Sequence, residues 1–257
     1  MKVLSLVNQK GGVAKTTTAI ALADGFARRG KKVLLIDFDP QGSLTTSCGV
    51  AEKDFTCPQA YRFLGLAQGM KAEVIELKRN LDLITADSRL ELANAELMTK
   101  IYRESFLRCA IDSIPKDLYD YVILDSSPSL SMITINVLAA SDHILIPVKP
   151  EFGSFKGIDL LLENIKAVRM AKPGINILGF VVTMAETRRS STKESVCILE
   201  EIAENNKTVV FNSHIRLAVA AADAPSHGKS IFDYAPSASV AQDYEALCQE
   251  ILVALEG

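Results

Sequence analysis

The chain has 257 residues, of which 48% are hydrophobic, and a formal net charge of −3 at pH 7. This length and apolar content suffice for one large domain or two small ones, and the net charge argues against a chain that is basic throughout and binds nucleic acid over its whole surface. The 5 cysteines are scattered without a CxxC pair, which favours reduced thiols over a zinc site or a disulfide framework. We expect neither secretion nor membrane insertion, because no signal pattern and no long apolar run are present.

Short apolar runs typical of buried parallel strands alternate with helical patterns along the chain. The predicted strands cover residues 2–7, 32–37, 81–86, 121–125, 143–148, 176–183 and 208–211. The predicted helical segments are the one between the first two strands, which ends near Gly30, and residues 43–80, 87–118 and 237–257. We therefore predict one domain, residues 1–257, with an α/β fold: a doubly wound, mostly parallel sheet with helices on both faces.

The first strand leads into the glycine-rich segment VNQKGGVAKTTTA, which opens a helix. Backbone N–H groups around Gly11 and Gly12 can turn toward one anion, and the helix N-terminus adds its dipole, so the segment predicts a phosphate site. In such a site the Lys15 ammonium reaches the phosphates and the Thr16 hydroxyl binds Mg²⁺. We expect a helical backbone at Ala14, because a positive φ would demand glycine there. A glycine-rich turn with surface lysines is the alternative.

Carboxylates follow two of the predicted strands. Asp37 and Asp39 precede Pro40 at the carboxyl edge of the sheet, where α/β proteins bind their ligands. From this pattern, Asp37 has either a structural or a catalytic role. Asp39 is either catalytic or a cap of the following helix. Asp125 ends the apolar run YVILD, and an ionised carboxylate rarely ends a buried strand without a partner. These positions predict an acidic site beside the phosphate loop.

Three parts of the chain resemble the ParA/Soj family of DNA-partition ATPases, which carry a deviant Walker A motif. They are KGGVAKTT, VLLIDFDPQGSLTTSCG and residues 119–142, which read YDYVILDS and then SPSLSMITINVLAASD. The resemblance runs from Met1 to about Ser154 and continues more weakly to Tyr234. It implies the P-loop NTPase fold, ATPase activity, and ATP and Mg²⁺ as cofactors. The nucleotide-binding residues that it implies are Lys10, Gly11, Gly12, Val13, Ala14, Lys15, Thr16, Thr17, Thr183, Met184, Asn212 and Ser213.

The resemblance also implies roles for these side chains. Lys15 contacts the phosphates of its own subunit, Lys10 crosses an ATP-bound dimer to the partner's phosphates, and Asp39 orients or activates the attacking water. Thr16, Asp39 and Asp125 are the implied Mg²⁺ ligands, directly or through water. The serine-rich segment 125–131 is either a switch loop that senses the γ-phosphate or an ordinary strand-to-helix turn.

Basic residues occur in AETRRSSTK and around RLAVAAADAPSHGK, and family members bind DNA without sequence preference in their ATP-bound dimers. The DNA contacts implied here are Arg188, Arg189, Lys193 and Arg216, with Lys229 as a further candidate. The second segment exceeds the usual family spacing by about one helical turn, and a solvated basic loop is the alternative reading. We expect a cytoplasmic, nucleoid-associated protein that partitions plasmids or chromosomes with a ParB-type partner, which stimulates hydrolysis.

Two other functions need features that the sequence lacks. A MinD-like membrane switch requires a basic amphipathic tail, but residues 237–257 contain acidic residues and no Lys or Arg. An iron-protein reductase requires cysteines beside the switch loops, and none flanks the serine-rich segment 125–131. We therefore expect no membrane partner and keep the membrane switch as the second hypothesis.

Overall fold

The computed structural model describes residues 1–51, 59–67, 71–151, 153, 155–186 and 190–257. Within them, seven strands form one sheet in the order β3-β4-β2-β5-β1-β6-β7. The strands are β1 (Lys2–Leu6), β2 (Val33–Phe38), β3 (Ile75–Lys78), β4 (Leu81–Ile84), β5 (Tyr121–Ser126), β6 (His143–Val148) and β7 (Asn176–Val182). Each neighbouring pair is parallel except β3 with β4, which is antiparallel at the edge.

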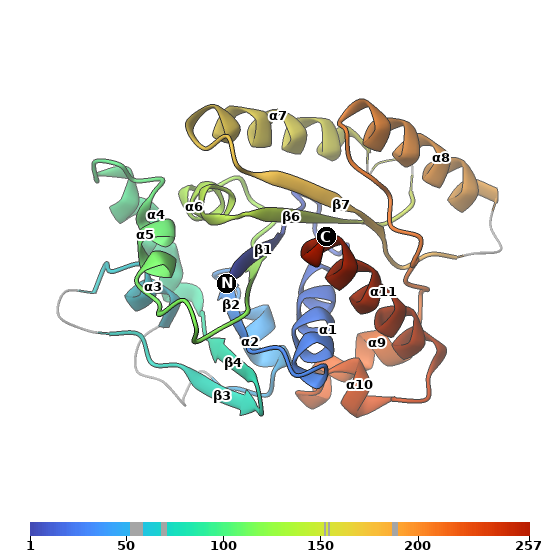
Figure 1. Ribbon diagram of the computed structural model, residues 1–257, viewed down its shortest axis with the longest axis horizontal. Coiled ribbons are helices and arrows are strands. Elements are labelled where there is room, and N and C mark those ends of the chain that lie inside the picture. Colours follow the sequence, from blue (N-terminus) through green and yellow to red (C-terminus); the bar gives the residue numbers. More distant parts are fainter. Residues whose placement is uncertain (52–58, 68–70, 152, 154, 187–189) are drawn as a thin grey trace.

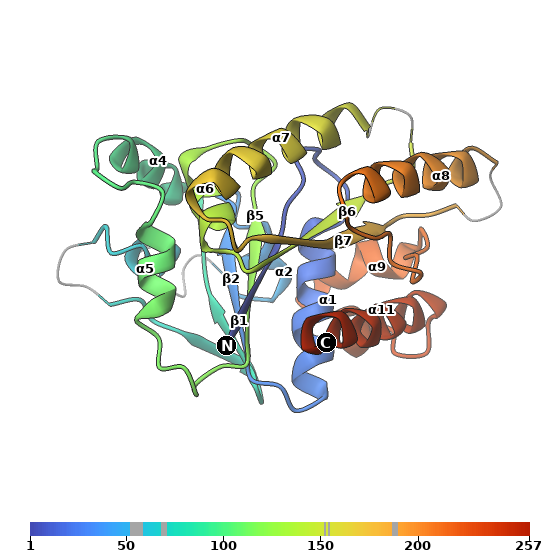
Figure 2. The same ribbon diagram turned by 45° about the horizontal axis from the view of Figure 1, so that its top comes forward.

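Helices cover both faces of the sheet (Figures 1 and 2). One face carries α3 (Gln59–Phe63), α4 (Glu91–Met98), α5 (Phe106–Asp112), α6 (Met132–Ala140), α7 (Phe155–Ala171) and α8 (Ser190–Asn205). The other carries α1 (Lys15–Arg28), α2 (Ser43–Ser47), α9 (Val219–Asp223), α10 (Ile231–Tyr234) and α11 (Ser239–Glu256). Short 3₁₀ turns, among them η2 (Ser88–Leu90) and η4 (Ala224–His227), join these elements.

The central strands are apolar on both sides because each of their faces packs against helices. Every residue of β2 and β5 is buried, as a doubly covered parallel sheet requires. On one face, Phe26 of α1 packs against Tyr121 with ring centroids 5.2 Å apart, and Tyr244 of α11 is among the largest fully buried side chains. The predicted α/β fold with helices on both faces is confirmed.

Two predictions of where helices and strands lie are wrong. Residues 43–80 are not helical throughout, because β3 forms a hairpin with β4 through a turn in which Asn80 adopts a left-handed backbone. Residues 208–211 form no strand but a single bridge between Phe180 and Val210. That pairing stops because Lys207 turns left-handed on one side and Glu250 binds the next free backbone N–H groups on the other.

The region after β7 packs closely against α2. Gly228 has φ +62°, and a Cβ atom placed on it would lie 2.6 Å from the Cα atom of Gly49. Ser230 donates a hydrogen bond to the fully buried Asp24 of α1, and Lys78 of β3 forms an ion pair with the same carboxylate at 3.0 Å. The end of the segment that exceeds the usual family spacing thus packs against the residues after α2, and Ser230, which follows that segment, is hydrogen-bonded to α1.

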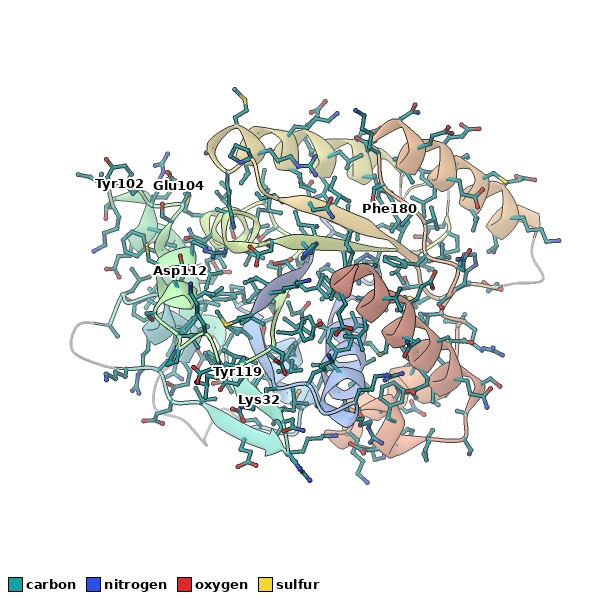
Figure 3. The ribbon with its side chains drawn as sticks, viewed as in Figure 1. Lys32, Tyr102, Glu104, Asp112, Tyr119 and Phe180 are labelled. Atoms are coloured by element: carbon teal, nitrogen blue, oxygen red, sulfur yellow. The ribbon has the colours of Figure 1, made fainter. Side chains whose placement is uncertain are left out.

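The strand order brings four carboxyl ends together. Because β2, β5, β1 and β6 are neighbours, the loops that follow them share one edge of the sheet. In register, Asp125 lies beside Leu6 of β1 on one side and beside Asp37 of β2 on the other. Lys32 and Tyr119, labelled in Figure 3, precede β2 and β5 and mark the opposite edge. The carboxyl edge is where a ligand site is expected in such a fold.

Candidate nucleotide site

The phosphate loop connects β1 to α1 and turns its backbone twice through the left-handed region. Gly12 has φ +70° and Ala14 has φ +58°, so our expectation of a helical backbone at Ala14 is wrong. A left-handed backbone costs a residue with a Cβ roughly 1–2 kcal/mol, and alternating backbone conformations of this kind aim successive N–H groups at one point. The loop is held by the Thr183 hydroxyl, which donates to the Val13 carbonyl at 3.0 Å.

The loop leaves space where a phosphate would lie. A Cβ atom placed on Gly11 or Gly12 would meet no heavy atom of the described chain within 4 Å. Lys15 is buried at the start of α1, and its Nζ atom donates to the Lys10 carbonyl at 3.2 Å. Burial lowers the pKa of Lys15, and the nearby carboxylate of Asp125 opposes that effect. An anion in the loop would stabilise the charged form of this lysine.

Thr16 and Asp125 form the polar floor of the site. The Thr16 hydroxyl donates to Asp125 Oδ2 at 2.7 Å, whereas Asp125 Oδ1 is buried and finds no hydrogen-bond partner in the described part of the chain. Burial, followed by the charge of Asp37, raises the pKa of Asp125 to about 8. A buried, unpartnered carboxylate oxygen next to a hydroxyl is the donor set that a hard cation such as Mg²⁺ prefers.

Asp37, near the end of β2, and Asp39, just after it, have different environments. Asp37 is fully buried and accepts hydrogen bonds from the Asp39 N–H at 3.0 Å, the Thr45 N–H at 2.9 Å and the Thr45 hydroxyl at 2.8 Å. Burial raises the pKa of Asp37 to about 6. Asp37 thus fixes the turn before α2. Asp39 is half-buried and caps that turn by accepting from the Gln41 N–H at 3.0 Å.

The serine-rich segment 125–131 leads from β5 into α6. Ser126 donates to the Leu6 carbonyl at 2.8 Å, and Ser131 is the N-cap of α6, accepting a hydrogen bond from the Thr134 N–H. Ser127 and Ser129 share a hydrogen bond at 3.0 Å between their hydroxyls. Ser126 and Ser131 therefore have structural roles, while a γ-phosphate sensor in this segment stays a prediction.

Lys10 lies on the same edge and is bound within its own subunit. Its Nζ atom forms an ion pair with Glu151, which follows β6 and also pairs with Lys149 at 2.9 Å. Sequence reasoning missed Glu151, which lies shortly after β6 at the same edge of the sheet where β2 and β5 end with Asp37 and Asp125, and the same positional rule would have found it. The pair places Lys10 beside the phosphate loop without directing it into its own site.

A cavity of about 240 Å³ opens directly beside the phosphate loop. Its described lining includes Gly12, Ala14, Thr17, Met184, Ile215, Arg216, Leu217, Ala218, Ala221, Ala222 and Tyr244. Met184, with φ +53°, follows the buried Thr183 at the end of β7. Asn212 and Ser213 are not among these lining residues, and Glu250 accepts their N–H groups at 2.9 Å and 3.0 Å. The sequence missed the alanine-rich wall from α9.

The basic residues named from the sequence are dispersed. Arg188 and Arg189 lie outside the described residues. Lys193 is exposed on α8, and Lys229 is exposed after η4. Arg216 lies at the edge of the cavity just described and is paired with Asp243 of α11, an acid of the C-terminal helix whose contact with Arg216 was not predicted.

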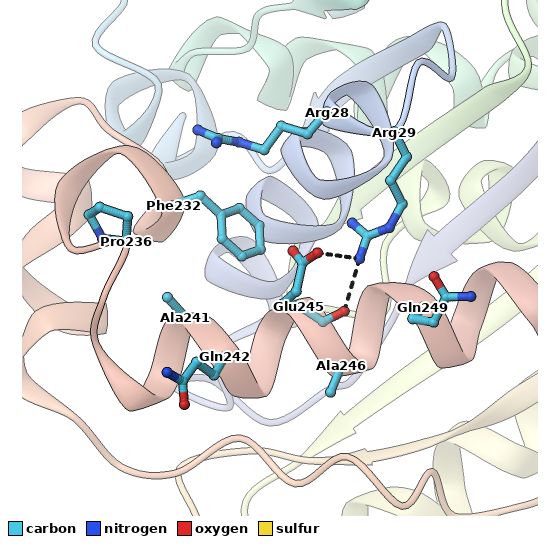
Figure 4. A pocket seen from close by; sticks show the side chains of 9 residues that line it. All are labelled: Arg28, Arg29, Phe232, Pro236, Ala241, Gln242, Glu245, Ala246 and Gln249. Atoms are coloured by element: carbon cyan, nitrogen blue, oxygen red, sulfur yellow. Dashed lines mark hydrogen bonds and ion pairs between the residues drawn. The ribbon is translucent and has the colours of Figure 1, made fainter.

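A second cavity lies away from this site. It has a volume of about 740 Å³ and is bounded by the end of α1, by Phe232 and by one face of α11 (Figure 4). Arg29 crosses it to Glu245, at 2.7 Å from the carboxylate, and Arg28 lies over the Phe232 ring at 5.5 Å from the centroid. Because its arginines are already paired and the phosphate loop is at the other end of α1, this groove is not the nucleotide site.

A glycine-rich loop joins a strand to a helix, and a buried lysine begins that helix. The next residue, Thr16, is hydrogen-bonded to Asp125 at the end of a neighbouring strand. These features define the P-loop NTPase class. The comparisons specify the class further. A family model described as "AAA domain" matches residues 1–177. The sporulation initiation inhibitor protein Soj of Bacillus subtilis (strain 168) is 37% identical over 256 residues, which cover 97% of this chain and 98% of that protein.

The chromosome-partitioning ATPase Soj of Treponema pallidum (strain Nichols) is 36% identical over 257 residues, covering 98% of this chain and 97% of that protein. Among solved structures, cobyrinic acid a,c-diamide synthase from Mycobacterium smegmatis with bound ADP and magnesium has a TM-score of 0.84 at 26% identity, covering 100% of this chain and 96% of that chain. The chain belongs to the ParA/Soj family and is a P-loop ATPase, as its motifs indicated. Within the described residues, no helix is both long and apolar enough to cross a bilayer.

Proposed function

We propose that this protein is an ATP-dependent dimerising switch that binds DNA without sequence preference in its ATP-bound state and releases it after hydrolysis. The observation that carries the proposal is the open phosphate loop above the Thr16–Asp125 pair, with Lys15 buried beside it. ADP and magnesium bound to a structural relative support ATP and Mg²⁺ as the cofactors. We treat residues 1–257 as one domain, since all strands of the described residues belong to one sheet.

The side chains divide the work of binding and hydrolysis. Lys15 neutralises the phosphates as a point charge, and the Thr16 hydroxyl with the free Asp125 oxygen would hold Mg²⁺, with Asp39 as the third predicted ligand. Mg²⁺, when bound, neutralises charge on the phosphates during transfer. We assign the adenine to the cavity that Met184 lines. The preceding residue, Thr183, is hydrogen-bonded to the Val13 carbonyl and so connects this side of the cavity to the phosphate loop.

Dimerisation would place Lys10 in the partner's site. Since Glu151 binds Lys10 in cis, closing the dimer requires that this ion pair opens and that phosphate replaces the carboxylate. The exchange substitutes one anion for another, so the lysine need not remain desolvated without a partner. A lysine delivered in this way would stabilise charge on the transferring phosphoryl group.

The cellular role follows from the family. Relatives named as chromosome-partitioning proteins support a role in plasmid or chromosome partitioning, and we infer a ParB-type partner that stimulates hydrolysis. Cytoplasmic residence on the nucleoid is part of the same proposal. The DNA surface is assigned to Arg188, Arg189, Lys193 and Arg216.

Replacing Asp39 by alanine should slow hydrolysis by about 10²- to 10⁴-fold, the contribution expected of a group that positions or deprotonates the attacking water. ATP binding should persist, because the phosphate loop and Asp125 remain. The product is a long-lived ATP dimer, measured by light scattering over time after ATP is added. Asp117→Ala, an exposed aspartate at the opposite edge, is the control and should return to monomer as the parent does. Parental disassembly of Asp39→Ala would exclude a catalytic role.

DNA binding measured with ATP, with ADP and without nucleotide tests the proposed switch directly. Binding should require ATP, ignore sequence and weaken steeply with salt, because each neutralised phosphate contributes about −0.9 to the slope of log affinity against log salt. Replacing Arg188 and Arg189 together by glutamate should flatten that slope and nearly abolish binding, while ATP-driven dimers still form.

The matched control for that double variant is Lys116→Glu with Lys166→Glu, which changes the charge equally at two exposed lysines elsewhere. It should keep most of the parental slope. If the arginine variant dimerises and also keeps the parental slope, residues 188 and 189 are a solvated loop. Equal DNA binding in all three nucleotide states would contradict the switch itself.

A further inference from the structure

Arg216 lies both at the cavity beside the phosphate loop and on the outer surface. Its backbone lies beside the end of β7, where the Ala185 N–H donates to the Ile215 carbonyl at 2.9 Å and the Leu217 N–H donates to the Ala185 carbonyl at 3.1 Å. Its side chain lines the cavity next to Gly12 of the phosphate loop, and 49% of the side chain is exposed. The segment that carries this arginine is therefore both a wall of the nucleotide cavity and part of the outer surface.

The guanidinium of Arg216 is not available in this state. Asp243 accepts three hydrogen bonds from the residue: from Nε at 2.6 Å, from Nη2 at 2.7 Å and from the backbone N–H at 3.1 Å. The carboxylate is only 13% exposed and belongs to α11, a helix of 18 residues. Two parallel N–H···O bonds are the same arrangement by which a guanidinium binds a phosphate.

We infer that Asp243 acts as an internal substitute for a DNA phosphate, which occupies Arg216 until nucleotide enters the adjacent cavity. This inference rests on the proposed DNA-binding function and specifies its regulation. On this inference the arginine gains a DNA phosphate only when it loses Asp243, because the two anions compete for one cation.

A nucleotide in the cavity would adjoin the ion pair between Arg216 and Asp243. Ile215, Leu217 and Ala218 line the cavity on both sides of Arg216, so a base that fills the cavity touches the backbone whose N–H is bound to Asp243. On the helix side, Tyr244 follows Asp243, lines the same cavity and lies 3.3 Å from the Thr18 hydroxyl in α1. Both partners of the ion pair thus adjoin the ligand, and a ligand that fits better when they separate shifts the equilibrium toward free Arg216.

The test is DNA binding by nucleotide-free Asp243→Asn, measured across salt concentrations on DNA of arbitrary sequence. Release of one arginine per subunit should steepen the salt slope by about 0.9 and tighten binding at 0.1 M salt by about eightfold. The ratio of affinities with and without ATP should fall by the same factor. Asp243→Ala should behave alike, and thermal unfolding of both variants verifies that they fold. Adding Arg216→Ala to Asp243→Asn should remove the gain.

Glu245→Gln is the matched control. It removes one negative charge from the same helix, but Glu245 binds Arg29 in the groove of Figure 4 and not Arg216, so nucleotide-free DNA binding should stay parental apart from a small general charge effect. If Asp243→Asn gains no more than Glu245→Gln while the parent binds DNA only with ATP, the inference is wrong and the proposed function stands. If neither parent nor variant binds DNA in any nucleotide state, both are wrong.

Discussion

Lys15→Ala should lose ATP binding. The ammonium is buried at the floor of the phosphate loop, within the field of Asp125, and the other lysine of the loop, Lys10, is bound to Glu151. Removing one partner of a buried, hydrogen-bonded charge pair costs about 2–5 kcal/mol, which corresponds to roughly 30- to 5,000-fold in Kd. Titration with ATP and Mg²⁺ by calorimetry measures the change.

The control is Lys166→Ala, which removes an exposed lysine from α7. It should bind ATP as the parent does. Thermal unfolding separates a binding defect from a folding defect, since Lys15 is also a buried charge near carboxylates. Parental ATP affinity in a folded Lys15→Ala protein would remove the basis for the nucleotide site.

The predictions from sequence succeeded where a local pattern determines the geometry. The strands from VLLID and YVILD were predictable because a parallel sheet covered on both faces needs continuous apolar runs, and their carboxyl ends located Asp37 and Asp125 in advance. The hairpin of β3 was missed although Ile75–Lys78 alternates between apolar and charged residues as a half-buried strand does, because the run is only 4 residues long and the turn at Asn80 was not recognised as a hairpin signal.

The contacts that sequence reasoning missed depend on distant parts of the chain. Asp243 meets Arg216 across 27 residues and Glu151 meets Lys10 across 141 residues, and no local spacing encodes either pair. The backbone of Ala14 also depends on a distant residue. Its left-handed conformation is tolerated because Thr183, just after β7, holds the loop by a hydrogen bond, and no local pattern encodes that contact. A single sequence thus predicts which groups reach the edge of the sheet but not how they pair.

Lys10→Ala should bind ATP but fail both to dimerise with ATP and to hydrolyse it. The reason is that Lys15 and the Thr16–Asp125 pair, which form the cis site, are untouched, whereas the lysine proposed to reach the partner's phosphates is gone. A cation supplied in trans to a transferring phosphoryl group is worth about 10³- to 10⁵-fold in rate. Calorimetry for ATP, light scattering for dimers and phosphate release for turnover separate the three properties.

Glu151→Gln is the control that makes this result specific, because it opens the same ion pair and keeps the lysine. If Lys10 acts in trans, the glutamine variant should still form ATP dimers, at an ATP concentration no higher than the parent needs, since its lysine no longer has to leave a carboxylate. If the two variants lose dimerisation equally, the ion pair itself is what the fold requires, and a trans role for Lys10 is excluded. Dimers of parental stability and activity in Lys10→Ala would identify Lys10 as a surface residue.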